Sequence, residues 1–213
     1  MTEHKRPDSS VRSDFAREDW NARYAGSELL WTAEPNRRFA SEVEGLEPGR
    51  ALDLACGEGR NAVWLAERGW RVTGVDFSDV ALGKAERLAA SRSVEVEWVL
   101  ADVLEYTPKR EAFDLVTALY LQLPHEELAS VLRSAVDALA PEGTLIVLGH
   151  DTTNLTEGLG GPRDASVLFT PEDVVPQLEG LAVERAEKVL RTVALEDGEA
   201  TAIDALVRAR RPR

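Results

Sequence analysis

Three acidic residues lie in or directly after short apolar runs, where a bound ligand could reach them. Asp53 lies inside the run at 51–55, Asp76 follows the run at 71–75, and Asp102 follows the run at 94–100. Apolar runs that alternate with helical periods predict parallel strands, whose carboxyl ends meet at one edge of a sheet. Carboxylates gathered there can accept hydrogen bonds from the vicinal hydroxyls of a ribose and from an exocyclic amine. The pattern favours a nucleoside ligand.

A glycine turn follows the first of these runs. Gly57 and Gly59 flank Glu58 between the strand and a predicted helix, and a glycine there lets a ligand approach the backbone. The spacing G-x-G-x-x-A also fits a dinucleotide fingerprint, so an NAD-dependent oxidoreductase stays open as an alternative. Glu58 and Asp53 would both oppose a diphosphate at this position. The turn therefore favours a nucleoside without phosphates.

The elements that must position these residues form a series of strands and helices. Strands are predicted at 51–55, 71–75, 94–100, 113–119 and 144–148, and helices at 61–68, at 79–91 and after Pro124. The segment 150–169 has little periodicity and is expected to be a loop. Thr170 to Asp173 fits a capping box that starts another helix. Two β-rich runs, 182–195 and 200–209, are expected to form a hairpin through a turn at 196–199.

The N-terminal part differs from this series. Residues 1–13 are polar, and we expect them to be disordered. Residues 14–45 are expected to form an aromatic cap, since five of the thirteen aromatic residues lie between 14 and 40. The whole chain, 1–213, is expected to be one α/β domain with a mainly parallel sheet.

Composition narrows the classes of protein. The net charge is −13, which disfavours nucleic acid as a partner, and the C-terminal arginines are expected to form a solvated tail. The longest apolar runs are too short to span a membrane, and the N-terminus does not resemble a secretory signal. Cys56 is the only cysteine, so no disulfide within the chain and no paired-cysteine zinc site is possible; we expect a buried side chain and no metal. These features predict a cytoplasmic protein.

The motifs together resemble those of the class I S-adenosylmethionine-dependent methyltransferases. Ala51–Asn61 (ALDLACGEGRN) is similar to their first motif, Val75–Ser78 to the acidic end of their second strand, and Ala101–Val103 to their adenine-side motif. The resemblance spans residues 20–210. The GEGRN sequence and the upstream aromatic residues are closest to a small-molecule branch that includes the tellurite-resistance and thiopurine-type enzymes. It implies a doubly wound, seven-stranded sheet with an antiparallel last strand.

The resemblance also implies roles for single residues, with S-adenosyl-L-methionine as the cofactor. Asp53 and the Gly57 backbone would lie near its methionine end, Asp76 would bind the ribose and Asp102 the adenine amine. Val103 would contact the adenine ring and the Leu119 carbonyl the methionine amino group, with Arg37 as a carboxylate partner. Trp20, Tyr24 and Trp31 would form a lid. The other expected cofactor-binding residues are Ala55, Gly59, Asn61 and Phe77.

Methyl transfer by in-line displacement at a sulfonium needs positioning more than a nucleophilic side chain. His150 and Tyr120 follow two predicted strands at the carboxyl edge and are the candidate catalytic residues, with His150 as a general base or an orienting group. The expected acceptor is a small molecule: a thiol, a hydroxyl, an amine or a metalloid oxyanion. A module that binds S-adenosylmethionine without turnover remains an alternative. The protein is expected to be a monomer or a homodimer.

Overall fold

Seven strands form one sheet in the order β3-β2-β1-β4-β5-β7-β6. The computed structural model describes residues 9–26, 28–195 and 198–213. The strands are β1 (Arg50–Leu54), β2 (Arg71–Asp76), β3 (Glu97–Leu100), β4 (Phe113–Leu119), β5 (Leu139–His150), β6 (Ala182–Leu195) and β7 (Gly198–Arg210). β1 to β5 pair in parallel, whereas β7 is antiparallel to both of its neighbours, β5 and β6. The predicted doubly wound sheet is confirmed.

The strand order reverses between β1 and β4, which creates the crevice where ligands bind in such sheets. In the register of the sheet, Asp53 on β1 lies between Gly74 on β2 and Thr117 on β4. On the other side of β4, His150 at the end of β5 is paired with Asp204 on β7. The switch point and the end of β5 therefore lie at the same edge of the sheet.

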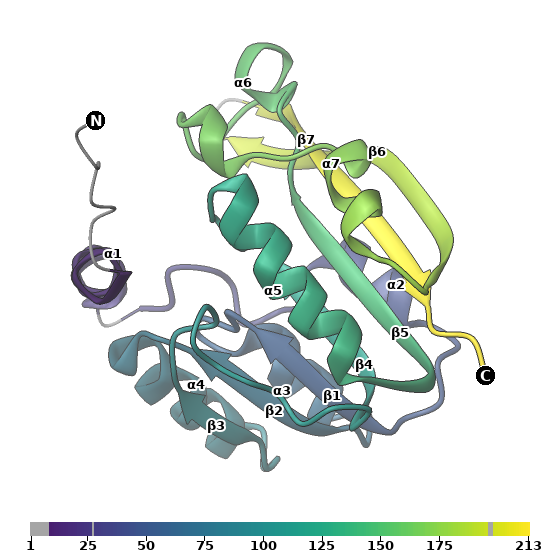
Figure 1. Cartoon of the computed structure of the whole chain (residues 1–213). Coiled ribbons are helices and arrows are strands. Elements are labelled where there is room, and N and C mark those ends of the chain that lie inside the picture. Colours follow the sequence, from purple (N-terminus) through teal and green to yellow (C-terminus); the bar gives the residue numbers. More distant parts are fainter. Residues whose placement is uncertain (1–8, 27, 196–197) are drawn as a thin grey trace, which may run out of the picture.

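Helices cover both faces of the sheet (Figure 1). Each face has its own hydrophobic cluster. The longer helices are α1 (Ser9–Tyr24), α2 (Arg37–Val43), α3 (Arg60–Ala66), α4 (Asp79–Ser91) and α5 (His125–Ala138). α5 crosses one face and buries Leu128, Val131, Leu132 and Ala135, which lie on one side of the helix at i, i+3, i+4 and i+7. α2 and α3 contribute Phe39, Ala62 and Leu65 to the cluster on the other face.

Several elements differ from those predicted. β5 starts at Leu139 rather than at the predicted residue 144, because Leu139 already pairs with Phe113 before an irregularity at residues 140–143. The expected loop at 150–169 contains α6 (Asn154–Glu157) and a 3-10 turn (Ala165–Val167). The capping box at Thr170 is confirmed. The helix that it starts, α7 (Pro171–Val174), is short and continues as a 3-10 turn (Val175–Gln177) with proline at its second residue.

The two ends of the chain also differ from expectation. Residues 9–13 of the segment predicted to be disordered are helical, as the start of α1, and residues 1–8 lie outside the described residues. Residues 196–197 of the predicted hairpin turn also lie outside them. The prediction of a solvated arginine tail is wrong for the first two of its four arginines. Arg208 and Arg210 belong to β7, and Arg208 donates to the Glu42 carbonyl at 2.7 Å and forms an ion pair with Glu184.

Candidate functional site

The three predicted acids lie at one edge of the sheet and are all buried. Burial raises the pKa of Asp53 and of Asp76, and each is raised further by a neighbouring acid, Asp76 and Asp102 respectively. The three carboxylates are therefore close enough to interact electrostatically. The structure brings the predicted constellation together.

Asp76 ties the glycine turn to the end of β2. Its Oδ2 accepts from the Gly57 amide at 2.7 Å and its Oδ1 from the Ser78 amide at 2.9 Å. Gly57 and Gly59 both have positive φ, and a Cβ on Gly59 would lie 2.5 Å from the Trp98 ring. Because each carboxylate oxygen can accept more than one hydrogen bond, Asp76 keeps capacity for a ligand hydroxyl.

Asp53 has one satisfied and one unsatisfied oxygen. Thr117 donates to its Oδ1 at 2.7 Å, whereas Oδ2 is buried and has no partner among the described residues. Burial raises the pKa of Asp53 to about 7, against smaller opposing effects of Thr117 and Arg60. A buried acceptor without a donor is rare in proteins and suits the amino group of a ligand.

Arg60, the first residue of α3, was not identified from the sequence. Burial lowers the pKa of its guanidinium and Arg191 lowers it further, while Tyr120 and Asp53 oppose this effect. Within the described part of the chain Arg60 forms no ion pair, although it interacts electrostatically with Asp53. A cation and a carboxylate that are held near each other without pairing fit the two charges of an amino-acid group.

Glu58, between the two glycines, anchors the N-terminal segment. Its carboxylate accepts from the Leu30 amide at 2.9 Å and the Trp31 amide at 3.2 Å, and it pairs with Lys84 of α4 at 2.9 Å. The Glu58 and Lys84 side chains are only 3% and 4% exposed, and Lys84 also donates to the Glu28 carbonyl. The residue expected to repel a diphosphate therefore holds residues 28–31 against the glycine turn.

The expected lid residues have different positions. Tyr24 is buried, and its hydroxyl would lie 3.0 Å from a Cβ on Gly57, so it covers the glycine turn. Burial and Asp76 raise the pKa of Tyr24 far above its ordinary value. Trp20 stacks on Tyr24, whereas the Trp31 side chain is 50% exposed and Arg37 is also exposed.

Tyr120 and His150 belong to a second cluster, which is centred on Asp204. Tyr120 donates to Asp204 Oδ2 at 2.8 Å, and Arg191 donates to the same oxygen at 2.7 Å. The pKa of Tyr120 is raised by burial and by Asp204, so its hydroxyl stays protonated. His150 Nδ1 lies 3.2 Å from Asp204 Oδ1, outside hydrogen-bond geometry. Asp204, which burial alone would make less acidic, has a lowered pKa because His150 and Arg191 favour its charged form.

Asn36 connects the two clusters. Its backbone amide donates to Asn61 Oδ1 at 3.0 Å, and its side chain donates to the Tyr120 hydroxyl at 3.1 Å. Its Oδ1 also caps α2. A continuous set of hydrogen bonds thus runs from the α3 helix of the glycine motif, through Asn36 and Tyr120, to Asp204.

The other expected cofactor-binding residues surround the same edge of the sheet. Ala55 and Phe77 follow β1 and β2, Leu119 ends β4, and Val103 follows Asp102. Asn61 is buried in α3. Their contacts with a cofactor remain predictions. Sequence reasoning assigned no role to Asp204, Arg191, Asn36 and Arg60. Two of them left a signal in the sequence: Asp204 is an acid inside an apolar run, and Arg60 lies inside the GEGRN sequence.

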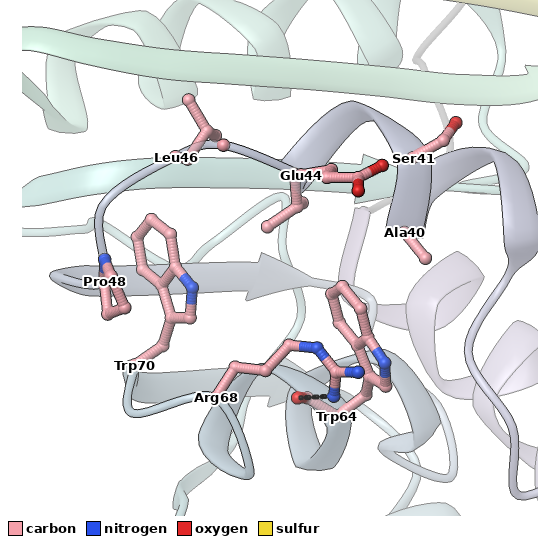
Figure 2. A pocket seen from close by; sticks show the side chains of 10 residues that line it. Ala40, Ser41, Glu44, Leu46, Pro48, Trp64, Arg68 and Trp70 are labelled. Carbon is pink, nitrogen blue, oxygen red and sulfur yellow. Dashed lines mark hydrogen bonds between the residues drawn. The ribbon is translucent and has the colours of Figure 1, made fainter.

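A hollow of about 500 Å³ lies away from these clusters (Figure 2). It is lined by the end of α2, by the segment that follows it and by Trp64, Arg68 and Trp70, and the Arg68 guanidinium lies 3.9 Å from the Trp64 ring centroid. Pro48 and Trp70, on its wall, precede β1 and β2. The hollow is therefore at the amino ends of the strands, at the edge opposite to the acids. No His/Cys/Asp/Glu cluster suited to a metal occurs within the described ranges, and none of the described helices is long and apolar enough to cross a membrane.

Comparisons with known proteins agree with this geometry. Residues 51–143 match the family model described as "Methyltransferase domain". The chain is 36% identical over 125 residues to the demethylmenaquinone methyltransferase of Thermus thermophilus, an alignment that covers 58% of this chain and 55% of that protein. The chain spans about half the length of the curated relatives it matches.

Two solved structures have the same fold. The N-methyltransferase NodS from Bradyrhizobium japonicum, in complex with S-adenosyl-l-homocysteine, superposes with a TM-score of 0.68 at 20% identity, over 92% of this chain and 98% of that one. TehB from Haemophilus influenzae superposes with a TM-score of 0.69 at 16% identity, over 92% and 66%. Residues 51–143 therefore match the methyltransferase-domain family, and the chain shares the fold of these solved structures, which is the fold expected for a class I S-adenosylmethionine-dependent methyltransferase.

Proposed function

We propose that this protein is an enzyme that transfers the methyl group of S-adenosylmethionine to a small molecule. The observation that carries the proposal is the convergence of three buried carboxylates and a glycine turn at the switch point of the sheet. When bound, the cofactor supplies a methyl group on a sulfonium, which is open to attack by a nucleophile.

The residues fit each part of the cofactor. Asp76 binds the ribose hydroxyls, and Asp102 and Val103 bind the adenine. The unpartnered Oδ2 of Asp53 accepts from the methionine amino group, together with the Leu119 carbonyl. Arg60 binds the methionine carboxylate; we favour it over Arg37 because Arg60 is half-buried beside Asp53, whereas Arg37 is exposed.

The acceptor in this proposal is a small molecule rather than a nucleic acid. The chain has a net charge of −13, which opposes the approach of a polyanion. The relatives support a small acceptor, since their names include demethylmenaquinone and ubiquinone biosynthesis methyltransferases. A cytoplasmic location and a monomeric or homodimeric state belong to the same proposal.

Calorimetric titration with S-adenosylhomocysteine tests the cofactor assignment. We expect saturable binding, weakened by Asp76→Ala by about 1.5–3 kcal/mol because hydrogen bonds to a charged group are lost. Asp114→Ala, which removes a carboxylate at the opposite end of β4, is the control and should leave the affinity unchanged. Binding of NAD without binding of S-adenosylhomocysteine would overturn the proposal.

A separate assay tests turnover. Formation of S-adenosylhomocysteine from S-adenosylmethionine with a panel of thiols, phenols and amines is expected for an enzyme. Cofactor binding without turnover across the whole panel would favour a binding module instead.

A further inference from the structure

His150 and Asp204 form a pair that the proposed cofactor site does not use. His150 Nδ1 lies 3.2 Å from Asp204 Oδ1, and the two side chains are 11% and 2% exposed. Nδ1 has no hydrogen bond within the described residues, although the Asp204 carboxylate lies this close to it. A small rotation of the ring would align Nδ1–H with the carboxylate, which leaves Nε2 unprotonated as a potential base.

Three side chains surround the Asp204 carboxylate. Tyr120 and Arg191 both donate to its Oδ2, which leaves Oδ1 for His150. The Tyr120 hydroxyl is itself fixed by Asn36, and the Tyr120 backbone has a positive φ of 56°. A non-glycine residue in this conformation is strained and is found preferentially at functional sites. These contacts fix the orientation of the carboxylate from three elements.

The charged and titratable groups around His150 come from every neighbouring element. Asp204 lies on β7, Arg191 on β6 and Tyr120 after β4, and Arg60 of α3 interacts electrostatically with Tyr120 and Arg191. On its remaining side the ring lies against the backbone of Gly161, where a Cβ would lie 2.9 Å from the imidazole. The positive charge of Arg191 offsets the negative charge of Asp204, so these two side chains together contribute a net charge close to zero.

The pair lies beside the proposed methionine end of the cofactor. The Leu119 carbonyl, assigned above to the methionine amino group, directly precedes Tyr120, whose amide donates to the Leu148 carbonyl on β5. His150 is the last residue of β5, two residues after Leu148. The imidazole therefore lies on the strand next to the point where the methyl group would be presented.

We propose that His150 is the general base of the methyl-transfer step, oriented by Asp204, and that the acceptor is a hydroxyl or thiol that is protonated at neutral pH. This inference rests on the proposed function. In the step, His150 Nε2 takes the proton from the acceptor oxygen or sulfur, which forms a bond to the methyl carbon. The bond between that carbon and the sulfonium breaks, and its electron pair stays on the sulfur. The imidazolium then releases its proton to solvent.

The test compares two thiols of similar size that differ in acidity. Near neutral pH, 4-nitrobenzenethiol is already ionised and needs no base, whereas benzyl mercaptan is protonated. We expect His150→Gln to lower kcat/KM for benzyl mercaptan by about 100-fold or more, the usual effect of losing a general base, and to change that for 4-nitrobenzenethiol by less than about threefold. Asp204→Asn should give the same pattern as a positioning residue.

Two controls keep the result interpretable. His125→Gln replaces an exposed histidine at the start of α5 and should leave both thiols unaffected. The S-adenosylhomocysteine affinity of His150→Gln should equal that of the unaltered protein, which shows that the variant is folded.

The outcomes separate the two proposals. Equal loss with both thiols, or no loss with either, overturns the role of His150 while leaving the cofactor assignment intact. Turnover confined to amines, or absent with every hydroxyl and thiol acceptor, overturns the acceptor class. Failure of the unaltered protein to bind S-adenosylhomocysteine overturns the proposed function itself.

Discussion

Asp53 shows which properties of a single residue can be predicted from the sequence and which cannot. Its position inside an apolar run marked it as unusual, and the same signal identified Asp76 and Asp102 at the ends of their strands. Nothing in the sequence indicates that Thr117 satisfies only one of the two Asp53 oxygens. Likewise, Asn36 and Tyr120 are 84 positions apart, and their contact depends on the completed sheet.

The raised pKa of Asp53 predicts a pH dependence of cofactor binding. The carboxyl group of Asp53 has a pKa of about 7, above its ordinary value of 3.8, because it is buried. The folded protein without ligand therefore holds an extra proton between these values, and its stability falls as the pH rises through this window. The cationic amino group of the cofactor favours the ionised carboxylate. S-adenosylhomocysteine affinity should therefore increase from about pH 6 to about pH 8.

Calorimetry across that range provides the measurement, and Asp53→Asn is the matched variant. The amide cannot ionise, so the affinity of this variant should be lower and should vary less with pH. Asp76 and Arg60 also interact with Asp53 and remain in both proteins. An equally steep pH dependence in Asp53→Asn would show that another group is responsible.

At the scale of elements, the clearest sequence signals were those supported by uninterrupted patterns. The strand at 113–119 and the helix at 79–91 have the predicted bounds, since one is nearly all apolar and the other has a serine cap. β5 begins earlier than predicted, because Pro141 and Gly143 are typical of turns and yet here lie inside the strand, at the irregularity in its pairing with β4. The N-terminal segment depends on Glu58, whose partners, residues 28–31 and Lys84, are far away in sequence.

The Glu58–Lys84 pair predicts how the N-terminal segment responds to mutation. Lys84→Met leaves the buried Glu58 carboxylate without its cation, and breaking a buried pair in this way typically costs about 3–5 kcal/mol. We expect a loss of this order in the free energy of unfolding, measured in urea, and faster amide hydrogen exchange at residues 30 and 31. Both amides donate to Glu58 in the intact protein.

Lys109→Met, at an exposed lysine, is the control and should change neither measurement. The double variant Glu58→Gln, Lys84→Met should be less destabilised than the sum of the two single variants, because it leaves no unpaired charge. Additive losses would indicate that the two side chains stabilise the protein independently.

At the scale of the whole molecule, the net charge follows directly from the sequence, but the expected position of the C-terminal arginines was incorrect. The arginines at the C-terminal end were expected to project as a tail, but the structure pairs them with acids. Arg208 pairs with Glu184, Arg211 with Glu111 and Arg213 with Glu142. A linear sequence shows a run of arginines, whereas their partners come from strands and turns that only the fold brings alongside.

These pairings predict that the protein does not bind RNA. The arginines that could neutralise phosphates already have acidic partners, and the remaining charge is strongly negative. Filter binding with transfer RNA at about 0.15 M salt should show no retention at micromolar protein. Retention that weakens with added salt would contradict the prediction and point to release of these arginines from their partners.

The place of β7 between β5 and β6 has a consequence for biosynthesis. β1 to β5, with all three acids of the cofactor edge, are translated before residue 151, whereas Asp204 is added only when β7 emerges. A nascent chain can therefore assemble the part that would hold the methyl donor well before His150 acquires its partner. If the proposed step is correct, the nascent chain cannot catalyse methyl transfer until β7 has been translated.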